Sequence, residues 1–133
     1  MVHGSRRRLP DIRQALAEGA GLILEMDADF SHQPAYLPRL LDAAESADLV
    51  IGSRYVPGGQ ADMGLVRYAC SRLLNAAFSR GLDVPIRDLS SGFRLYRGAV
   101  IREQDITSRD FDILQQTVVQ AFAEGWRVRE IPF

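Results

Sequence analysis

The sequence has little of three features that would each point to a particular class of protein. It has one cysteine, Cys70, so it cannot form an internal disulfide, and a reducing, cytoplasmic compartment is expected. Its apolar runs are only a few residues long, whereas a helix that spans a membrane needs roughly 20. Its charge is nearly balanced, with 16 basic residues against 17 acidic ones, which argues against a protein that binds nucleic acid through bulk charge.

What the chain does have is the size and composition of one folded domain. Its 133 residues are 47% hydrophobic and 25% charged, which is typical of a chain with a single hydrophobic core. Segments with a helical spacing of apolar residues alternate with short apolar runs typical of buried strands. This order predicts an α/β domain with a mainly parallel sheet flanked by helices. The expected helices cover residues 12–19, 37–44, 65–80 and 111–124, and the expected strands cover residues 22–26, 48–51, 93–96 and 127–131.

Two acidic residues, Asp27 and Asp29, directly follow the apolar run at residues 22–26. That run predicts a strand buried on both faces of a parallel sheet, and open α/β sheets bind ligands at the carboxyl ends of such strands. Residues two apart on an extended chain point the same way, so the two carboxylates would repel each other unless a cation lies beside them. Carboxylate oxygens suit Mg²⁺ or Mn²⁺. The alternative is that the two acids cap the turn and the following helix.

A second group of candidate residues has the chemistry of a phosphate site. Arg67 and Ser71 are four residues apart on the expected helix at 65–80, so they share one of its faces, and Arg54 at a strand end could converge on them. An arginine fork with a hydroxyl is suited to phosphate. The alternative is that the arginines only solvate a surface helix. This helix, apolar with a basic edge, could rest on an anionic membrane or could be a core helix.

Five sequence blocks, in the same order along the chain, resemble the family 2 glycosyltransferases, and most closely their polyprenyl-phosphate branch typified by dolichol-phosphate mannosyltransferase. Each block alone is weak, but the five together extend from the first expected strand to the end of the chain. The blocks are DADFSHQP at residues 27–34, VIGSRY at 50–55, PGG at 57–59, DLSSGFRLY at 88–96 and GWRVREIP at 125–132.

The resemblance implies a GT-A fold and a metal-dependent, inverting transfer of a mannose- or glucose-type sugar from a nucleotide-diphosphate donor to a polyprenyl phosphate. It implies that Asp27 and Asp29 hold Mg²⁺ or Mn²⁺ on the donor diphosphate, with Ser31 as the candidate third ligand. Some archaeal relatives have a glutamine at the position of Ser31. A peripheral contact with the cytoplasmic face of the membrane, where the lipid acceptor enters, is also implied.

The resemblance also places the acceptor phosphate and a candidate catalytic carboxylate. It assigns Arg54, Arg67 and Ser71 to the acceptor phosphate, and Asp88 to the role of general base or structural anchor. A lipid phosphate is already ionised near neutral pH, because its second pKa is about 6, and so it needs orienting more than deprotonating. A sugar hydroxyl acceptor would instead need a general base.

The nucleotide-binding strand–helix–strand with which the family begins is not expected in this sequence. Only 21 residues precede Leu22, and a βαβ unit takes roughly 30 or more. Residues 1–133 are therefore predicted to form one partial GT-A domain, the metal-binding and acceptor side. It would have an exposed apolar sheet edge that could drive dimerisation, and weak or no turnover alone.

Four alternatives to this interpretation remain. The chain could be a family 2 transferase with a saccharide hydroxyl acceptor, or a non-catalytic remnant or partner. It could also be one half of a split enzyme. A haloacid-dehalogenase-like phosphatase also has Asp-x-Asp after a strand, but that family has Gly-Thr where this chain has Phe30-Ser31.

Overall fold

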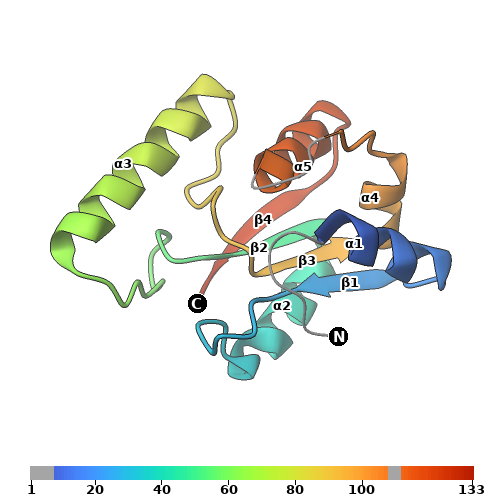
Figure 1. The fold of residues 1–133 in the computed structure, drawn as a ribbon, viewed down its shortest axis with the longest axis horizontal. Helices are drawn as coiled ribbons and strands as arrows, with labels where there is room; N and C mark the ends of the chain where they lie inside the picture. The colour runs from blue at the N-terminus through green and yellow to red at the C-terminus, as the bar shows by residue number, and fades with distance from the viewer. Residues whose placement is uncertain (1–7, 108–111) are drawn as a thin grey trace.

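The computed structural model of the chain describes residues 8–107 and 112–133. Its centre is a four-stranded sheet in the order β1-β3-β2-β4 (Figure 1). Strand β3 pairs antiparallel with both β1 and β2, and β2 pairs parallel with β4, so three strands run one way and β3 runs the other. The predicted α/β class is confirmed. The strands are β1 (Leu22–Glu25), β2 (Leu49–Ser53), β3 (Arg94–Arg97) and β4 (Val128–Pro132).

Helices cover both faces of the sheet, because alternate residues of the central strand β2 point to opposite sides. Leu49 and Ile51 pack in one cluster with residues of α1, α4 and α5. Val50 packs in the other cluster with residues of α2 (Figure 1). The structure extends β2 through Gly52, which was predicted to end it, and adds α4, which was not predicted. The helices are α1 (Arg8–Ala17), η2 (Pro34–Tyr36, a 3-10 turn), α2 (Leu37–Ala44), α3 (Leu65–Gly81), α4 (Gly98–Glu103) and α5 (Asp112–Ala123); the predicted start of α5 at Phe111 lies outside the described residues.

Strand β1 differs from the prediction of a strand buried on both faces in a parallel sheet. It is an edge strand, and its only paired neighbour among the described strands, β3, is antiparallel to it. Ile23 is buried, but Leu22 and Leu24 are 44% and 39% exposed. The reason is that α2 packs against β2, β3 and β4 on its face of the sheet. The predicted exposed apolar edge is present at this strand.

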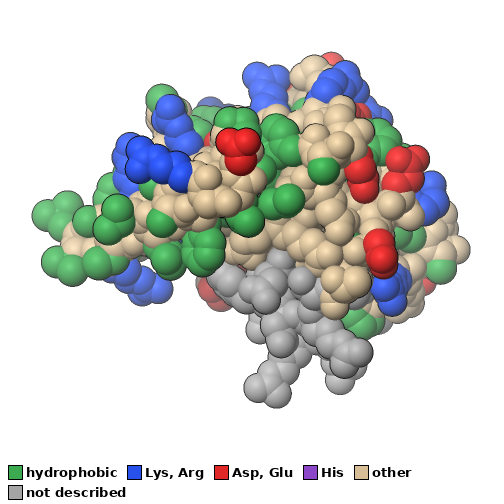
Figure 2. Space-filling model, turned by 90° about the horizontal axis from the view of Figure 1, so that it is seen from above, with side chains coloured by type: hydrophobic (Ala, Val, Ile, Leu, Met, Phe, Trp, Pro, Cys, Tyr) green, Lys and Arg blue, Asp and Glu red, His purple; other side chains and the backbone are tan. Residues whose placement is uncertain are grey.

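Helix α3 projects from the body of the domain instead of packing into it (Figure 1). Leu65 and Leu73, which belong to its predicted apolar stripe, are 88% and 72% exposed, so the core-helix alternative is wrong. Cys70, also on this helix, is exposed as well. Figure 2 shows hydrophobic side chains gathered on the projecting side of the molecule. No helix in the described part of the chain is long and apolar enough to cross a membrane.

Candidate functional site

The predicted site residues follow strand ends that share one edge of the sheet. Since β1, β2 and β4 run in the same direction, their carboxyl ends meet at one edge, and antiparallel β3 begins there. Asp27 and Asp29 follow β1, and Arg54 follows β2. Asp88 lies in the segment that leads into β3. The fold therefore places the predicted metal residues and acceptor residues at one edge, where open α/β sheets bind ligands.

The loop after β1 is organised around the carboxylate of Asp29. Asp29 Oδ1 accepts hydrogen bonds from the Ser31 amide at 3.0 Å and from the Ser31 hydroxyl at 2.5 Å. These bonds lower the pKa of Asp29, which keeps this exposed carboxylate ionised. Phe30, which lies between Asp29 and Ser31 in the chain, adopts a left-handed conformation (φ 64°) and is 89% exposed. Asp29 thus caps its own turn, while η2 begins without any side-chain cap.

His32 holds the start of this loop to the core. Its Nδ1 accepts a 2.8 Å hydrogen bond from the backbone N–H of Asp27. The buried imidazole stacks on Phe93 with ring centres 4.9 Å apart and meets the edge of Phe133 at 5.5 Å. His32 is therefore a hydrogen-bonded packing residue.

Two carboxylates on an exposed loop fit a divalent cation that completes its shell with water and phosphate oxygens. The side chain of Asp27 is half exposed, and Asp29 is exposed. Among residues 8–107 and 112–133, no three His, Cys, Asp or Glu side chains gather to hold a metal. Mg²⁺ usually binds through one or two carboxylates and substrate phosphates, so the donor set suits it. Ser31 as a third ligand stays a prediction, because its hydroxyl here supports Asp29.

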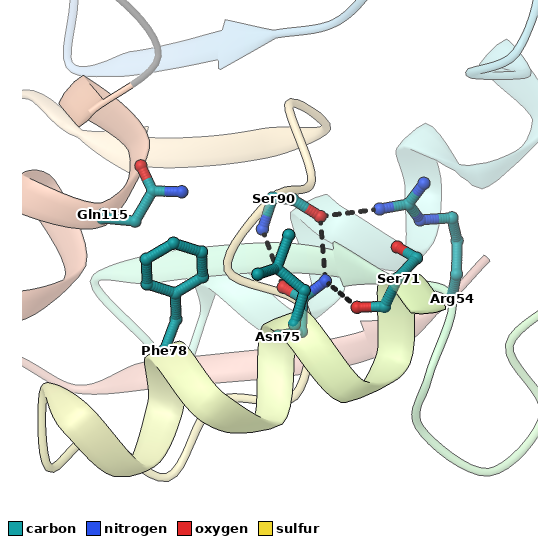
Figure 3. A pocket seen from close by; sticks show the side chains of 7 residues that line it. Arg54, Ser71, Asn75, Phe78, Ser90 and Gln115 are labelled. Atoms are coloured by element: carbon teal, nitrogen blue, oxygen red, sulfur yellow. Dashed lines mark hydrogen bonds between the residues drawn. The ribbon is translucent and has the colours of Figure 1, made fainter. Parts of the chain in front are cut away.

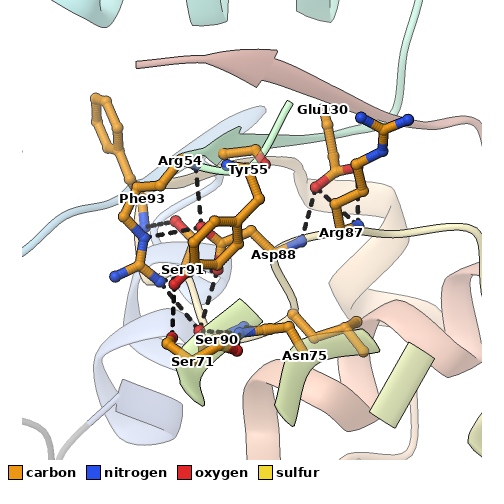
Figure 4. Close-up of polar contacts among 12 residues, drawn as sticks. Arg54, Tyr55, Ser71, Asn75, Arg87, Asp88, Ser90, Ser91, Phe93 and Glu130 are labelled. Atoms are coloured by element: carbon orange, nitrogen blue, oxygen red, sulfur yellow. Dashed lines mark hydrogen bonds and ion pairs between the residues drawn. The ribbon is translucent and has the colours of Figure 1, made fainter. Parts of the chain in front are cut away.

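Arg54 and Asp88 form a paired site at the end of β2 (Figure 4). The Nε and Nη2 atoms of Arg54 each donate a 2.9 Å hydrogen bond to the Asp88 carboxylate, and the Arg54 backbone N–H donates another at 3.1 Å. The bond to Asp88 raises the pKa of Arg54. Nη1 of Arg54 makes no hydrogen bond with any residue that the structure describes, so it can still bind an anion.

The geometry favours the anchoring role of Asp88 over a role as general base. Its side chain is 0% exposed, and its oxygens accept bonds from three Arg54 nitrogens and from the Ser90 hydroxyl. Glu130 holds the same segment, because its carboxylate accepts the backbone N–H groups of Arg87 and Asp88 at 2.9–3.1 Å.

A buried arginine organises the turn between Asp88 and β3. Arg94 is 0% exposed, and its three guanidinium nitrogens donate to the carbonyl oxygens of Leu89, Ser91 and Leu114 at 2.6–2.8 Å. These bonds tie the turn to α5. The role of Arg94 was not predicted, because an isolated arginine in a strand gives no sign of which carbonyl groups it will meet.

A cavity of about 310 Å³ lies beside Arg54 (Figure 3). Arg54 and Ser71 line one end, and the ring of Phe78 with Gln115 of α5 lines the other. Ser71 is further held by the hydroxyl of Tyr55 at 2.5 Å. The structure thus brings Arg54 and Ser71 together, as predicted. The full lining consists of Arg54, Ser71, Leu74, Asn75, Phe78, Ser90 and Gln115.

Arg67, the third residue predicted to bind the acceptor phosphate, does not line this cavity. It is exposed on α3, one turn before Ser71. Three polar lining residues were not predicted as site residues from the sequence: Asn75, Ser90 and Gln115. Asn75 could have been found from its position, because it lies one helical turn after Ser71 on the same face of the helix.

Comparisons with known proteins identify the family of this chain. The model of the glycosyl transferase family 2 matches residues 12–104. The undecaprenyl-phosphate mannosyltransferase of Micrococcus luteus is 38% identical over 128 residues, covering 90% of this chain and 51% of that protein. The polyprenol monophosphomannose synthase of Mycolicibacterium smegmatis is 38% identical over 122 residues, covering 88% and 46%. The dolichol-phosphate mannosyltransferase of Pyrococcus furiosus is 31% identical over 114 residues, covering 81% and 31%. The chain spans about half the length of the first two relatives.

Proposed function

Because the chain belongs to the glycosyl transferase family 2, we propose that it forms the metal-binding and acceptor side of an enzyme that transfers a sugar to a polyprenyl phosphate. The donor is a nucleotide-diphosphate sugar of mannose or glucose type, and the transfer inverts the configuration at the sugar carbon. The chain alone binds the donor weakly and turns over little or nothing, since it corresponds to only part of the relatives' length.

The observation that carries this proposal is the cavity beside Arg54, which is polar at one end and apolar further along. One end offers a guanidinium N–H and the Ser71 hydroxyl, which suit a phosphate. Leu74 and Phe78 supply apolar surface further along, which suits the first isoprene units of a lipid. A free sugar would leave this apolar surface unused.

The carboxylate loop is proposed to receive the donor. Asp27 and Asp29 would hold Mg²⁺ or Mn²⁺, which when bound neutralises the charge that develops on the departing nucleotide diphosphate. Ser31 keeps the Asp29 carboxylate oriented, and His32 holds the backbone of Asp27 against the core. These contacts hold the two carboxylates in a fixed arrangement before the donor binds.

The acceptor is proposed to be a phosphate and not a hydroxyl. An ionised phosphate needs no base to attack the sugar carbon, whereas a hydroxyl does. Asp88, the carboxylate placed for that task, is buried and already bonded to Arg54 and Ser90. Arg54 would orient the phosphate, and Arg67, exposed on α3, would add attraction for it.

Helix α3 is proposed to contact the cytoplasmic face of an anionic membrane. It contains no acidic residue. Its arginines would face anionic headgroups while its exposed apolar residues enter the interface. The exposed apolar residues are Leu65, Val66, Leu73, Leu74 and Phe78, followed by Leu82 at the helix end, and the arginines are Arg67, Arg72 and Arg80.

The test compares binding of undecaprenyl phosphate with binding of undecaprenol in detergent micelles. We expect the phosphate to bind at least tenfold more tightly, and Ser71→Ala combined with Arg54→Gln to remove that difference. Arg102→Gln, an exposed arginine of α4, is the matched control and should leave it intact. Equal binding of phosphate and alcohol by the unaltered chain would refute the proposal.

A further inference from the structure

Asn75 is the one buried residue of α3, a helix that otherwise projects from the domain. The residue is 3% exposed, and its side chain reaches the segment that leads into β3 (Figure 4). Nδ2 of Asn75 donates to the Ser71 carbonyl at 2.9 Å and to the Ser90 hydroxyl at 3.2 Å. Oδ1 of Asn75 accepts the backbone N–H of Ser90 at 3.2 Å. Asn75 and Ser90 each donate a hydrogen bond to the other, and these two bonds hold α3 against the body of the domain.

The donors and acceptors available on Ser90 determine the orientation of the Asn75 side-chain amide. A serine hydroxyl has one donor and two acceptor positions. The Ser90 hydroxyl donates to Asp88 at 3.0 Å and accepts from Arg54 Nη2 at 3.0 Å and from Asn75 Nδ2. All three positions are filled. Rotating the Asn75 amide would set its NH₂ group against the Ser90 N–H, so only the observed orientation satisfies every group.

This chain of bonds connects the two halves of the phosphate end of the cavity. Arg54 comes from the end of β2, and Ser71 comes from α3, one turn before Asn75. The connection runs from Ser71 through Asn75 and Ser90 to Asp88 and Arg54. The Ser71 hydroxyl is also held by Tyr55, next to Arg54, but Asn75 sets the position of the helix backbone that carries Ser71. The distance between the arginine and the hydroxyl therefore depends on Asn75 together with Tyr55.

We propose that Asn75 is a positioning residue for the acceptor phosphate. Its hydrogen bonds to Ser90 keep Ser71 of α3 close enough to Arg54 for both residues to bind the same phosphate. This inference rests on the proposed function of the cavity. Asn75 itself does not need to touch the phosphate. Its substitution loosens the helix and separates the two groups that bind the ligand, while the loop of Asp27 and Asp29 is left alone.

The test uses two substitutions of different chemistry in the full chain. Asn75→Leu keeps the size and removes all three hydrogen bonds. Asn75→Asp keeps the acceptor for the Ser90 N–H and removes both donations, which provides a second variant if the first does not fold. The matched control is Ser79→Ala, because the Ser79 hydroxyl donates to the Val84 carbonyl and so ties down the far end of the same helix.

Two readouts separate positioning from general damage. A spin label on Cys70, the single cysteine and exposed on α3, reports the motion of the helix without any ligand. In unlabelled protein, titration with undecaprenyl phosphate measures binding at Arg54 and Ser71, and a separate titration with Mn²⁺ measures binding at the loop of Asp27 and Asp29. We expect the Asn75 variants to increase label mobility and to weaken phosphate binding by about tenfold, with Mn²⁺ affinity unchanged and Ser79→Ala within twofold of the unaltered chain.

Phosphate binding by the Asn75 variants within twofold of the unaltered chain would overturn the inference, as would equal losses in Ser79→Ala or in Mn²⁺ affinity. Such results leave the proposed function standing, because the unaltered chain still selects phosphate over alcohol. If the unaltered chain itself fails to make that selection, the proposed function falls and the inference falls with it.

Discussion

At the scale of single residues, the Arg54–Asp88 pair is the contact on which the acceptor end depends. Removing one member of a buried ion pair costs more than the pair contributes, because the partner's charge is left uncompensated. Asp88→Asn places an amide N–H₂ or a weaker acceptor opposite three Arg54 donors. We expect it to lower the free energy of unfolding by roughly 2–4 kcal/mol in denaturant titrations.

The control for this substitution is Asp42→Asn, the same chemical change at an exposed position of α2. Surface changes of this kind are usually worth less than about 0.5 kcal/mol. An Asp88→Asn variant as stable as Asp42→Asn would contradict the anchoring role and would return Asp88 to consideration as a base.

Gly59 is a second residue whose identity matters for Arg54. A Cβ added there would lie 2.6 Å from the Ser53 carbonyl oxygen and 2.7 Å from the Arg54 carbonyl carbon, both of them backbone atoms that cannot move aside alone. We expect Gly59→Ala to cost about 1–3 kcal/mol in thermal or denaturant unfolding and to weaken phosphate binding. Gly21→Ala, where a Cβ meets nothing within 4 Å, should change neither. Equal behaviour of the two variants would show that the close approach at Gly59 is unimportant.

At the scale of elements, α3 carries the prediction of membrane contact. Its exposed leucines should insert into vesicles that contain phosphatidylglycerol, and its arginines should make the binding weaker in phosphatidylcholine and at high salt. Replacing Leu65 and Leu73 with Glu removes apolar surface and adds repulsive charge, so co-sedimentation should fall at least tenfold.

Leu41→Glu is the matched control for the vesicle experiment, since Leu41 is 51% exposed on α2. It introduces one of the same changes outside α3 and should leave vesicle binding nearly unchanged. A loss of binding in this variant equal to that of the α3 variant would argue against α3 as the contact surface.

At the scale of the whole molecule, an ion-pair group ties the sheet together at the edge opposite the site. Asp48, just before β2, accepts two 2.9 Å hydrogen bonds from the Arg127 guanidinium just before β4, and it lies 3.3 Å from Arg97 of β3. Side-chain hydrogen bonds from Arg127 lower the pKa of Asp48. Three strands are thereby joined through one carboxylate.

The lowered pKa of Asp48 gives the stability of the domain a defined dependence on pH. A carboxylate whose pKa is lower when folded contributes stability above its unfolded pKa of about 3.9, and this is lost as pH falls through the folded value. We expect Asp48→Asn to cost about 1–2 kcal/mol between pH 5 and 7, measured by urea unfolding, and progressively less below pH 4. A cost that does not change with pH would mean that the charge of Asp48 is not what stabilises the sheet.

The sequence by itself determined what is local in this protein: the helices and strands, from the spacing of apolar residues, and the family, from five short blocks in order. It also indicated Asp27, Asp29 and Arg54, because residues that follow strand ends are close in the chain to the feature that predicts them. Boundaries shifted by a few residues, and α4 was missed because six residues are too few to show a helical period.

Only the tertiary structure decided which distant groups meet. Periodicity shows that α3 has an apolar stripe, but whether the stripe meets a core depends on where the preceding loop carries the helix. The hydrogen bonds that occupy the Asp88 carboxylate come mainly from Arg54, 34 residues away. The role of Asn75 depends on Ser90, 15 residues away. Such contacts are set by packing of the whole sheet with its helices, and no pattern within either segment contains them.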